Sequence, residues 1–272
     1  KLRAIDYRVP TASAQVKSCI LFAGLHADAP STVREDVRTR RTTEEMFRAS
    51  GIAIDSVDVA HGRVVTLQPG RPQATSWVVP GDPSQAAFFS VLGTIHEDAD
   101  LTIVDVDATP ERVGFVDVLE RMGAQLSIEH HDARLSLRTK SSALVSVEVF
   151  SSEIPSVDEV PILAVAAAAA RGVSAFRDMG ELRLKESDRF EGAMTLVRAL
   201  GCRAWAEGDD FFVEGLSSAR LFAPFVIDAH LDHRMVMAAA VAGSAGQGCV
   251  IGGATTVSSS YPGFFADLAA LS

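Results

Sequence analysis

The sequence has no Asn, only three Cys, and no long apolar segment. Cys19, Cys202 and Cys249 are odd in number and widely spaced, so they indicate neither a disulfide framework nor a metal site, and we expect buried thiols. The longest apolar run, Ile162 to Ala170, is far below the roughly 18 residues that a membrane helix needs. No signal-like segment opens the chain. We therefore expect a soluble, cytoplasmic globular protein with no membrane partner.

Positive charge is scarce as well. The 272 residues include 25 Lys and Arg against 35 Asp and Glu, a net charge of −10, and the lysines are only Lys1, Lys17, Lys140 and Lys185. Because nucleic acids and acidic membranes require a basic face, neither is an expected partner. An anionic ligand would have to be bound by a local cluster of cations. The 47% hydrophobic content is enough for one large domain or two ordinary ones.

A helical pattern of small and apolar residues recurs about every 70 residues. Each copy begins with Ser or Asp, which are typical helix N-caps, and the copies start at Ser13, Ser84, Asp158 and Asp232. A short β-branched run follows each copy and indicates a strand, as in "LTIVDV" from Leu101 to Val106.

A second helix follows in three of the repeats and closes at Gly, which accepts the left-handed conformation past a helix end, at Gly51, Gly123 and Gly201. Two strand-like runs come next, as in "CRAWAEGDDFFVEG", where Gly208 to Asp210 indicate a turn. The pattern predicts an α/β fold of repeated βαβαββ units. The chain opens inside one unit and its last unit lacks the strand pair, so we expect a piece of a longer protein.

The stretch "ELRLKESDRF" gathers charged residues at one helix start. Asp188 and Glu191 are spaced as a capping box, which places Arg189 in the first helical turn, where a cation is unfavourable for the helix alone. Arg234 repeats the anomaly just after the predicted cap Asp232. Helix starts expose N–H groups and bind anions, so an anion site is one interpretation. Locally paired, solvated surface charges are the other.

Five stretches in this order, "ASAQVKS", "VPGDPSQAAFF", "DEVPILAVAAA", "ELRLKESDR" and "LDHRMVMA", resemble the EPSP synthase (3-phosphoshikimate 1-carboxyvinyltransferase) family over the whole chain. The resemblance implies two similar domains of three βαβαββ units each, with the active site in the cleft between them. Residues 1–80 would then be the last repeat unit of a first, incomplete domain, and residues 81–272 a second domain of three repeat units. The family's early segments that contact phosphoenolpyruvate are absent from this sequence.

The resemblance also implies a reaction, the transfer of the enolpyruvyl group of phosphoenolpyruvate to the 5-hydroxyl of shikimate 3-phosphate in aromatic amino-acid biosynthesis. Such an addition and elimination needs acid/base groups and a cationic cradle. By motif match the acid/base carboxylates would be Asp158 and Glu186, and the residues holding phosphoenolpyruvate would be Lys185, Arg189 and Arg234. Shikimate 3-phosphate would be held by Ser13, Ala14, Gln15 and Arg40. The resemblance implies no metal or other cofactor.

Two alternatives stay open beside this hypothesis. UDP-N-acetylglucosamine enolpyruvyl transferase shares the fold and the donor, but it characteristically uses a loop Cys, and no Cys here lies in a polar, Gly-rich loop. The other is a non-catalytic binding module of the same fold. Family members are usually monomeric. With most of one cleft wall missing and a sheet edge exposed, we expect this chain alone to be inactive and prone to self-association.

Overall fold

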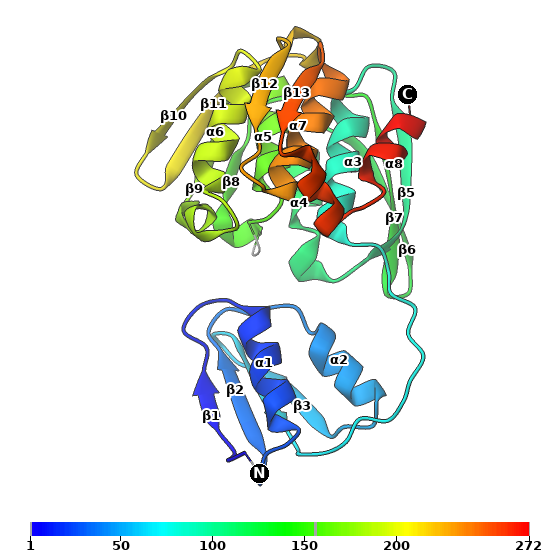
Figure 1. Ribbon diagram of the computed structural model, residues 1–272, viewed down its shortest axis with the longest axis vertical. Coiled ribbons are helices and arrows are strands. Elements are labelled where there is room, and N and C mark those ends of the chain that lie inside the picture. The colour runs from blue at the N-terminus through cyan, green and yellow to red at the C-terminus, as the bar shows by residue number, and fades with distance from the viewer. Residues whose placement is uncertain (1, 155–156, 272) are drawn as a thin grey trace. The chain divides into compact units, whose positions relative to one another are not determined.

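The computed structural model of the chain describes residues 2–154 and 157–271. The chain divides into two compact units, Lys1–Val79 and Pro80–Ser272 (Figure 1). Both units combine helices with mixed sheets, which confirms the predicted α/β class.

The first unit is one four-stranded sheet covered by two helices. The strands lie in the order β1-β2-β4-β3, with β1 parallel to β2 and the other pairs antiparallel. Alternate residues of β2 and β4, among them Val33, Val65 and Leu67, are buried against Leu21 and Phe47 of the helices, as the two-residue period of a strand requires. The elements are β1 (Asp6–Arg8), α1 (Ala14–Gly24), β2 (Ser31–Glu35), α2 (Thr42–Ala49), β3 (Ile54–Asp58) and β4 (Arg63–Leu67).

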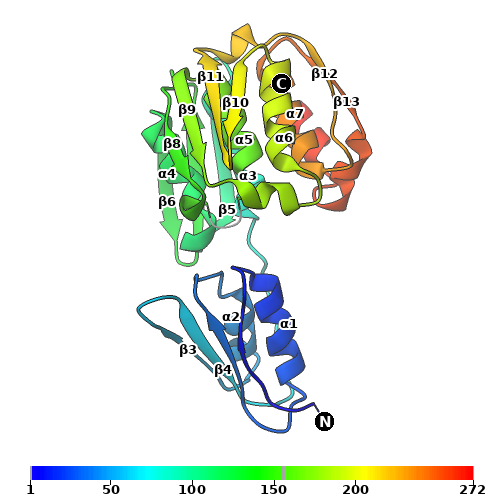
Figure 2. The ribbon, with the colours of Figure 1, turned by 90° about the vertical axis from the view of Figure 1, so that its left-hand side faces the viewer.

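The second unit repeats this pattern. The sheet β10-β11-β9-β8 has the same sequence of one parallel and two antiparallel pairings as the sheet of the first unit (Figure 2). In the sheet β5-β7-β6, a parallel bridge from Gly81 to Val106 stands where the fourth strand would be. The strands are β5 (Asp100–Asp107), β6 (Gln125–His131), β7 (Arg134–Lys140), β8 (Glu148–Phe150), β9 (Arg171–Arg177), β10 (Arg203–Glu207), β11 (Asp210–Leu216), β12 (Phe225–Asp228) and β13 (Cys249–Gly252).

The last repeat contains only two parallel strands, β12 and β13, in the part of the chain that the structure describes. By comparison with β8 and β9, the antiparallel hairpin would lie beside β13. Val226 and Val250, which are paired across these two strands, are 76% and 64% exposed. The outer edge of β13, where the other repeats carry the hairpin, therefore has no neighbouring strand within the described residues, and the paired valines on this sheet face solvent.

Three apolar helices, α3, α5 and α7, contact one another in the middle of the second unit (Figure 1). Every residue of α5, "VPILAVAAAA", is buried, as expected for a helix that is apolar on all sides. Each helix also contacts its own sheet, α3 through β5 and β7, α5 through β9 and β11, and α7 through β13. The helices of this unit are α3 (Pro83–Ile95), α4 (Gly114–Arg121), α5 (Val160–Ala169), α6 (Arg189–Ala199), α7 (His233–Ala245) and α8 (Phe264–Ala270).

Two of the four predicted helix starts are correct and two are wrong. Ser13 and Asp232 cap α1 and α7 through their side chains. Ser84 does not cap α3, because Asp82 does so and Pro83 occupies the first helical position, which suits proline. Asp158 does not cap α5 either. The N-cap there is Glu159, which makes no side-chain capping bond. The Asp158 carboxylate accepts a hydrogen bond from Arg189 instead of capping the helix.

The predicted Gly closures are confirmed, since Gly51, Gly123 and Gly201 all have positive φ. The prediction for the cysteines is wrong in part. Cys202 is buried and burial raises its pKa to about 11, but Cys19 is exposed on α1 and Cys249 is half-buried. Across residues 2–154 and 157–271, no helix is both long and apolar enough to cross a bilayer.

Candidate functional site

Arg189 is the centre of a buried ion-pair network at the start of α6. Asp188 caps the helix by accepting the Glu191 N–H at 3.0 Å, which fixes Arg189 as the first helical residue. The capping box is only half formed, because the Glu191 carboxylate lies 3.5 Å from Arg183 instead. The Arg189 side chain is fully buried. An unpaired buried guanidinium would be very costly, so its partners determine whether this helix start is stable.

Three carboxylates from different segments contact the Arg189 guanidinium. Nε donates to Asp232 Oδ2 at 2.8 Å, and Nη1 donates to Asp158 Oδ1 at 2.8 Å. Nη2 lies 2.6 Å from Glu186 Oε2. Asp232 and Asp158 are 43 and 31 residues away in sequence, so Arg189 joins the starts of α5 and α6 in one repeat to the start of α7 in the next.

Asp232 holds two helix starts together. Its side chain is fully buried; it accepts the Arg234 N–H at 2.9 Å as the cap of α7 and the Ser187 hydroxyl at 2.8 Å from the loop before α6. Burial acts to raise the pKa of Asp232, but the hydrogen bonds and charge of Arg189, with the Ser187 hydroxyl and the Arg234 N–H, lower that pKa below its usual value. Asp232 is thus an anion that both helices depend on.

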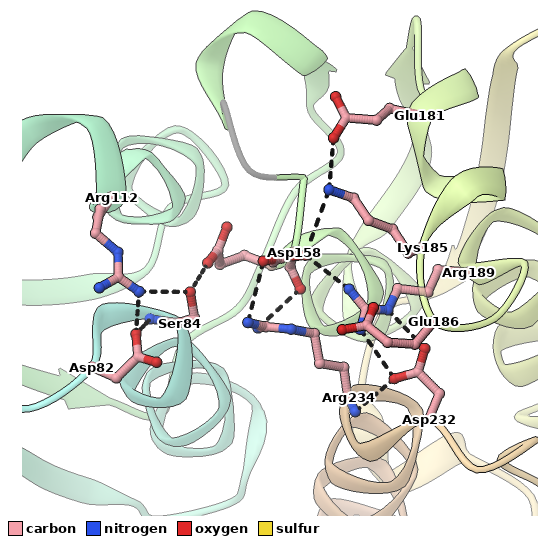
Figure 3. Close-up of polar contacts among 11 residues, drawn as sticks. Asp82, Ser84, Arg112, Asp158, Glu181, Lys185, Glu186, Arg189, Asp232 and Arg234 are labelled. Carbon is pink, nitrogen blue, oxygen red and sulfur yellow. Dashed lines mark hydrogen bonds and ion pairs between the residues drawn. The ribbon is translucent and has the colours of Figure 1, made fainter. Parts of the chain in front are cut away.

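Asp158 is the carboxylate on which the cations of the site converge (Figure 3). Besides Arg189, the Arg234 Nη2 donates to Asp158 Oδ2 at 3.3 Å, and Lys185 Nζ lies 4.0 Å from Oδ1. The Asp158 side chain is 26% exposed, whereas that of Arg234 is 10% exposed. The carboxylate is therefore partly open to solvent while the arginines behind it are buried.

Lys185 and Glu186 lie at the more open side of this network. Lys185 Nζ is 2.6 Å from Glu181 Oε1, and its side chain is 21% exposed. Glu186 is 56% exposed although its carboxylate touches the buried Arg189. A carboxylate with this combination can exchange protons with a ligand or with water while a cation fixes its position.

A pocket of about 460 Å³ opens beside the first turn of α6. It is bordered by the loop from Glu186 to Asp188 on one side and by Ile227 to His230 on the other. Glu186 belongs both to this pocket and to the Arg189 network, whereas Asp158, Lys185 and Arg189 are not among the residues that line the pocket. The histidine next to the network, His233, has a lowered pKa, chiefly because of burial and then because of the Arg234 charge.

A second polar group joins Asp158 to the start of α3. Glu159, which is 3% exposed, accepts a hydrogen bond from the Ser84 hydroxyl, and Ser84 is itself buried in the first turn of α3. Arg112 donates to the cap Asp82 and lies 3.4 Å from the Ser84 hydroxyl. Glu159 and Arg112 were missed from the sequence because they lie 75 and 28 residues from Ser84 and carry no spacing signal.

The residues expected to hold shikimate 3-phosphate all lie in the first unit. Ser13 accepts the Val16 N–H at 3.2 Å as the cap of α1, and Ala14 and Gln15 form the first helical turn. Arg40 is exposed in the segment between β2 and α2. The first unit thus contains four of the nine predicted site residues. The other five lie in the second unit and belong to one network, namely Asp158, Lys185, Glu186, Arg189 and Arg234.

Comparisons with known proteins agree on one family. Residues 1–268 match the EPSP synthase (3-phosphoshikimate 1-carboxyvinyltransferase) family. The 3-phosphoshikimate 1-carboxyvinyltransferases of Salinibacter ruber and Geobacillus kaustophilus are 37% and 39% identical to this chain over 100% and 99% of its length. The chain spans only 63% and 64% of those two relatives.

Solved structures show the same likeness. EPSP synthase from Acinetobacter baumannii matches with a TM-score of 0.87 and 35% identity, covering 97% of this chain and 61% of that one. The enolpyruvyl transferase NikO from Streptomyces tendae matches with a TM-score of 0.77 over 98% of this chain and 64% of its own. At 17% identity the second likeness concerns the fold alone.

Proposed function

The chain belongs to the EPSP synthase family, and from that premise we propose that it carries most of a 3-phosphoshikimate 1-carboxyvinyltransferase active site. The proposed reaction transfers the enolpyruvyl group of phosphoenolpyruvate to the 5-hydroxyl of shikimate 3-phosphate and releases phosphate. It is a step of the shikimate pathway of aromatic amino-acid biosynthesis, and we propose a cytoplasmic location for it.

One observation carries the proposal, namely the convergence of three cations on a single partly exposed carboxylate. Lys185, Arg189 and Arg234 approach Asp158 to 4.0, 2.8 and 3.3 Å. Phosphoenolpyruvate brings a phosphate and a carboxylate, and clustered cations at two helix starts suit both groups. The net charge of −10 does not oppose this, because the cations are local.

The two carboxylates would divide the proton transfers. Glu186 would protonate C3 of phosphoenolpyruvate, and Asp158 would accept the proton of the 5-hydroxyl as its oxygen bonds to C2. Glu186 would then take a proton back from the new methyl group as the double bond re-forms between C2 and C3 and the C2–O bond to phosphate breaks, so that phosphate leaves with the electron pair of that bond. Lys185, Arg189 and Arg234 would stabilise the negative charge on the donor throughout, which is the role of a preorganised cationic site.

The first unit would contribute to binding of the acceptor. Ser13, Ala14 and Gln15 expose the start of α1, whose unpaired N–H groups and dipole favour a phosphate. Arg40 adds a cation on the neighbouring segment. We further propose that residues 1–80 are the last repeat of an incomplete domain and residues 81–272 a domain of three repeats, as the matching strand orders support.

The proposal is tested by measuring phosphate release from phosphoenolpyruvate and shikimate 3-phosphate. The chain is assayed alone and as a complemented protein, that is, mixed with the separately expressed part of the Geobacillus kaustophilus relative that this chain does not match. We expect negligible release from the chain alone, because positioning of two reactants in a closed site supplies up to about 7–11 kcal/mol. We expect release from the complemented protein, dependent on both substrates.

The substrate control replaces shikimate 3-phosphate by UDP-N-acetylglucosamine, and we expect no phosphate release from it. Release with the nucleotide sugar would assign the chain to the sister activity. Binding of both proposed substrates without turnover would instead identify a non-catalytic module, and full activity of the chain alone would refute the incomplete-domain interpretation.

A further inference from the structure

One lysine and two glutamates form a buried cluster in the first unit, and no step of the proposed chemistry uses them. The side chains of Lys17, Glu35 and Glu44 are 0%, 2% and 1% exposed. Lys17 Nζ lies 3.1 Å from Glu35 Oε2 and 2.8 Å from Glu44 Oε1. Apolar residues of similar volume often replace such a group at no cost in stability. The cluster is therefore poorly explained as a device for stability alone.

The third partner of the lysine connects the cluster to the predicted acceptor site. Lys17 Nζ donates to the backbone carbonyl of Arg40 at 2.9 Å. Lys17 belongs to α1, one turn after Ser13, so this bond ties the start of α1 to the segment that presents Arg40. The two parts of the first unit proposed to contact shikimate 3-phosphate are thus joined by one buried ammonium.

The peptide before Arg40 is held as well. The Thr39 carbonyl accepts from Nη1 of the fully buried Arg63 at 2.7 Å, and the Thr39 hydroxyl donates to Glu35. Glu35 is in turn packed against the turn at Gly62, where φ is +93° and a Cβ would clash with the Glu35 carbonyl oxygen. Backbone groups on both sides of the Arg40 Cα are therefore fixed while its side chain is exposed.

Lys17 does not bind the substrate itself. Its side chain has no exposed surface, and its ammonium group donates hydrogen bonds to Glu35 and to the Arg40 carbonyl and forms an ion pair with Glu44. Any effect of Lys17 on the acceptor must pass through the residues it holds.

We propose, on the basis of the proposed function, that Lys17 is a positioning residue for shikimate 3-phosphate, acting through the backbone of Arg40. The buried ammonium orders the Arg40 segment before the ligand arrives, so that the guanidinium is presented to the phosphate-bearing acceptor without a further entropic cost on binding. Preorganisation of this kind changes the affinity for one ligand and leaves the other nearly unaffected.

The test is a double-mutant cycle in the complemented protein, with Lys17→Met, Arg40→Ala and the double variant. Removing Lys17 should raise KM for shikimate 3-phosphate about tenfold, as loss of a charged hydrogen bond does, and leave KM for phosphoenolpyruvate within about twofold. In the Arg40→Ala background, Lys17→Met should add less than about twofold, because coupled residues are not additive.

Two further variants separate positioning from stability. Leu21→Ala removes a fully buried side chain one turn further along α1, so it destabilises the unit without touching Arg40, and we expect it to leave both KM values unchanged. Lys17→Met leaves Glu35 and Glu44 without their cation, so the triple variant Lys17→Met, Glu35→Gln, Glu44→Gln removes all the buried charge. Should the single variant fail to fold, the triple variant takes its place in the cycle.

The outcomes divide cleanly. A selective rise in KM for shikimate 3-phosphate that disappears in the Arg40→Ala background supports the inference. Equal changes in both KM values, full additivity with Arg40→Ala, or the same change in Leu21→Ala overturns it. Wild-type complemented protein that shows no saturation by shikimate 3-phosphate refutes the proposed function instead, whatever the variants do.

Discussion

Replacing Asp232 by Asn should destabilise the second unit strongly although the two side chains have the same shape. Asp232 is fully buried and contacts the Arg189 guanidinium twice, at 2.8 and 3.3 Å. Removing one partner of a buried ion pair typically costs about 3–5 kcal/mol. In the variant, Arg189 still has Asp158 and Glu186 as partners, and Asn caps a helix about as well as Asp. We therefore expect the unfolding free energy to fall by about 3 kcal/mol, the lower end of that range.

The pH dependence of this loss is also fixed by the structure. The pKa of Asp232 is lowered in the folded protein from 3.8, so its stabilising effect is fully present above that value and is lost as the pH falls through the lower folded pKa. The difference in unfolding free energy between wild type and Asp232→Asn should therefore be constant from pH 8 to about pH 5 and shrink below about pH 4.

Urea denaturation at pH 7, 5 and 3 measures this difference. Asp228→Asn is the matched control, because Asp228 is an exposed carboxylate four residues earlier that accepts the His230 N–H, a bond that the Asn side-chain oxygen can also accept. Surface changes of that kind stay within about 0.5 kcal/mol. An Asp232→Asn variant as stable as the control at pH 7 would refute the account of Arg189 as a buried cation that depends on Asp232. So would a loss that does not diminish at pH 3.

Three further results are expected. Glu186→Gln in the complemented protein should lower turnover about 10²–10⁴-fold while shikimate 3-phosphate still binds, and turnover within about threefold of wild type would contradict its proton-transfer role. Arg234→Ala should raise KM for phosphoenolpyruvate about 10- to 100-fold, since a charge-assisted bond is lost, and equal effects on both substrates would point to a structural role. The pKa of His233 is lowered from 6.5 in the folded protein, so below that pH the unfolded chain binds more protons and the stability falls on acidification. His233→Asn should therefore lose less of its urea midpoint than wild type between pH 7 and pH 5. An equal loss in both proteins would contradict this role of His233.

Local signals in the sequence predicted the elements and their ends. Asp188 is recognisable as a helix cap from its spacing to Glu191, and Gly201 as a helix end from the apolar pattern before it. Both depend on contacts within a few residues, which sequence spacing records directly. The repeat could be read for the same reason, because each unit carries its own caps and turns.

Contacts between segments far apart in the sequence could not be predicted in the same way. Asp158 has a good capping residue type at a plausible helix start, but its carboxylate is used by Arg189 and Arg234, which lie 31 and 76 residues away. The resemblance to a family brought Asp158 into the site, whereas spacing alone placed it on a helix end. Its role in the reaction stays a prediction.

Burial of charge was the other limit. Lys17 appeared in the sequence only as part of "SAQVKS", and nothing local indicates that two glutamates, 18 and 27 positions later, surround it. The exposed thiol of Cys19, two residues further on, shows the opposite error. Residue type predicts burial on average, but the rotation of α1 against its sheet decides which side chain points inward.

The network around Arg189 sets the order in which α6 and α7 can fold while the protein is being synthesised. Arg189 leaves the ribosome after Asp158 and Glu186 but before Asp232, which is 43 residues later, so at that moment one of its three carboxylate partners is missing. Burying it then would leave a cation without its strongest partner, at a cost that the partly docked chain cannot meet. The first turn of α6 should accordingly wait for α7, and the two helices should dock in a single late step. A nascent chain halted before α7 should be sensitive to proteolysis at "LKESDR" and become resistant once the whole of α7 has emerged and docked.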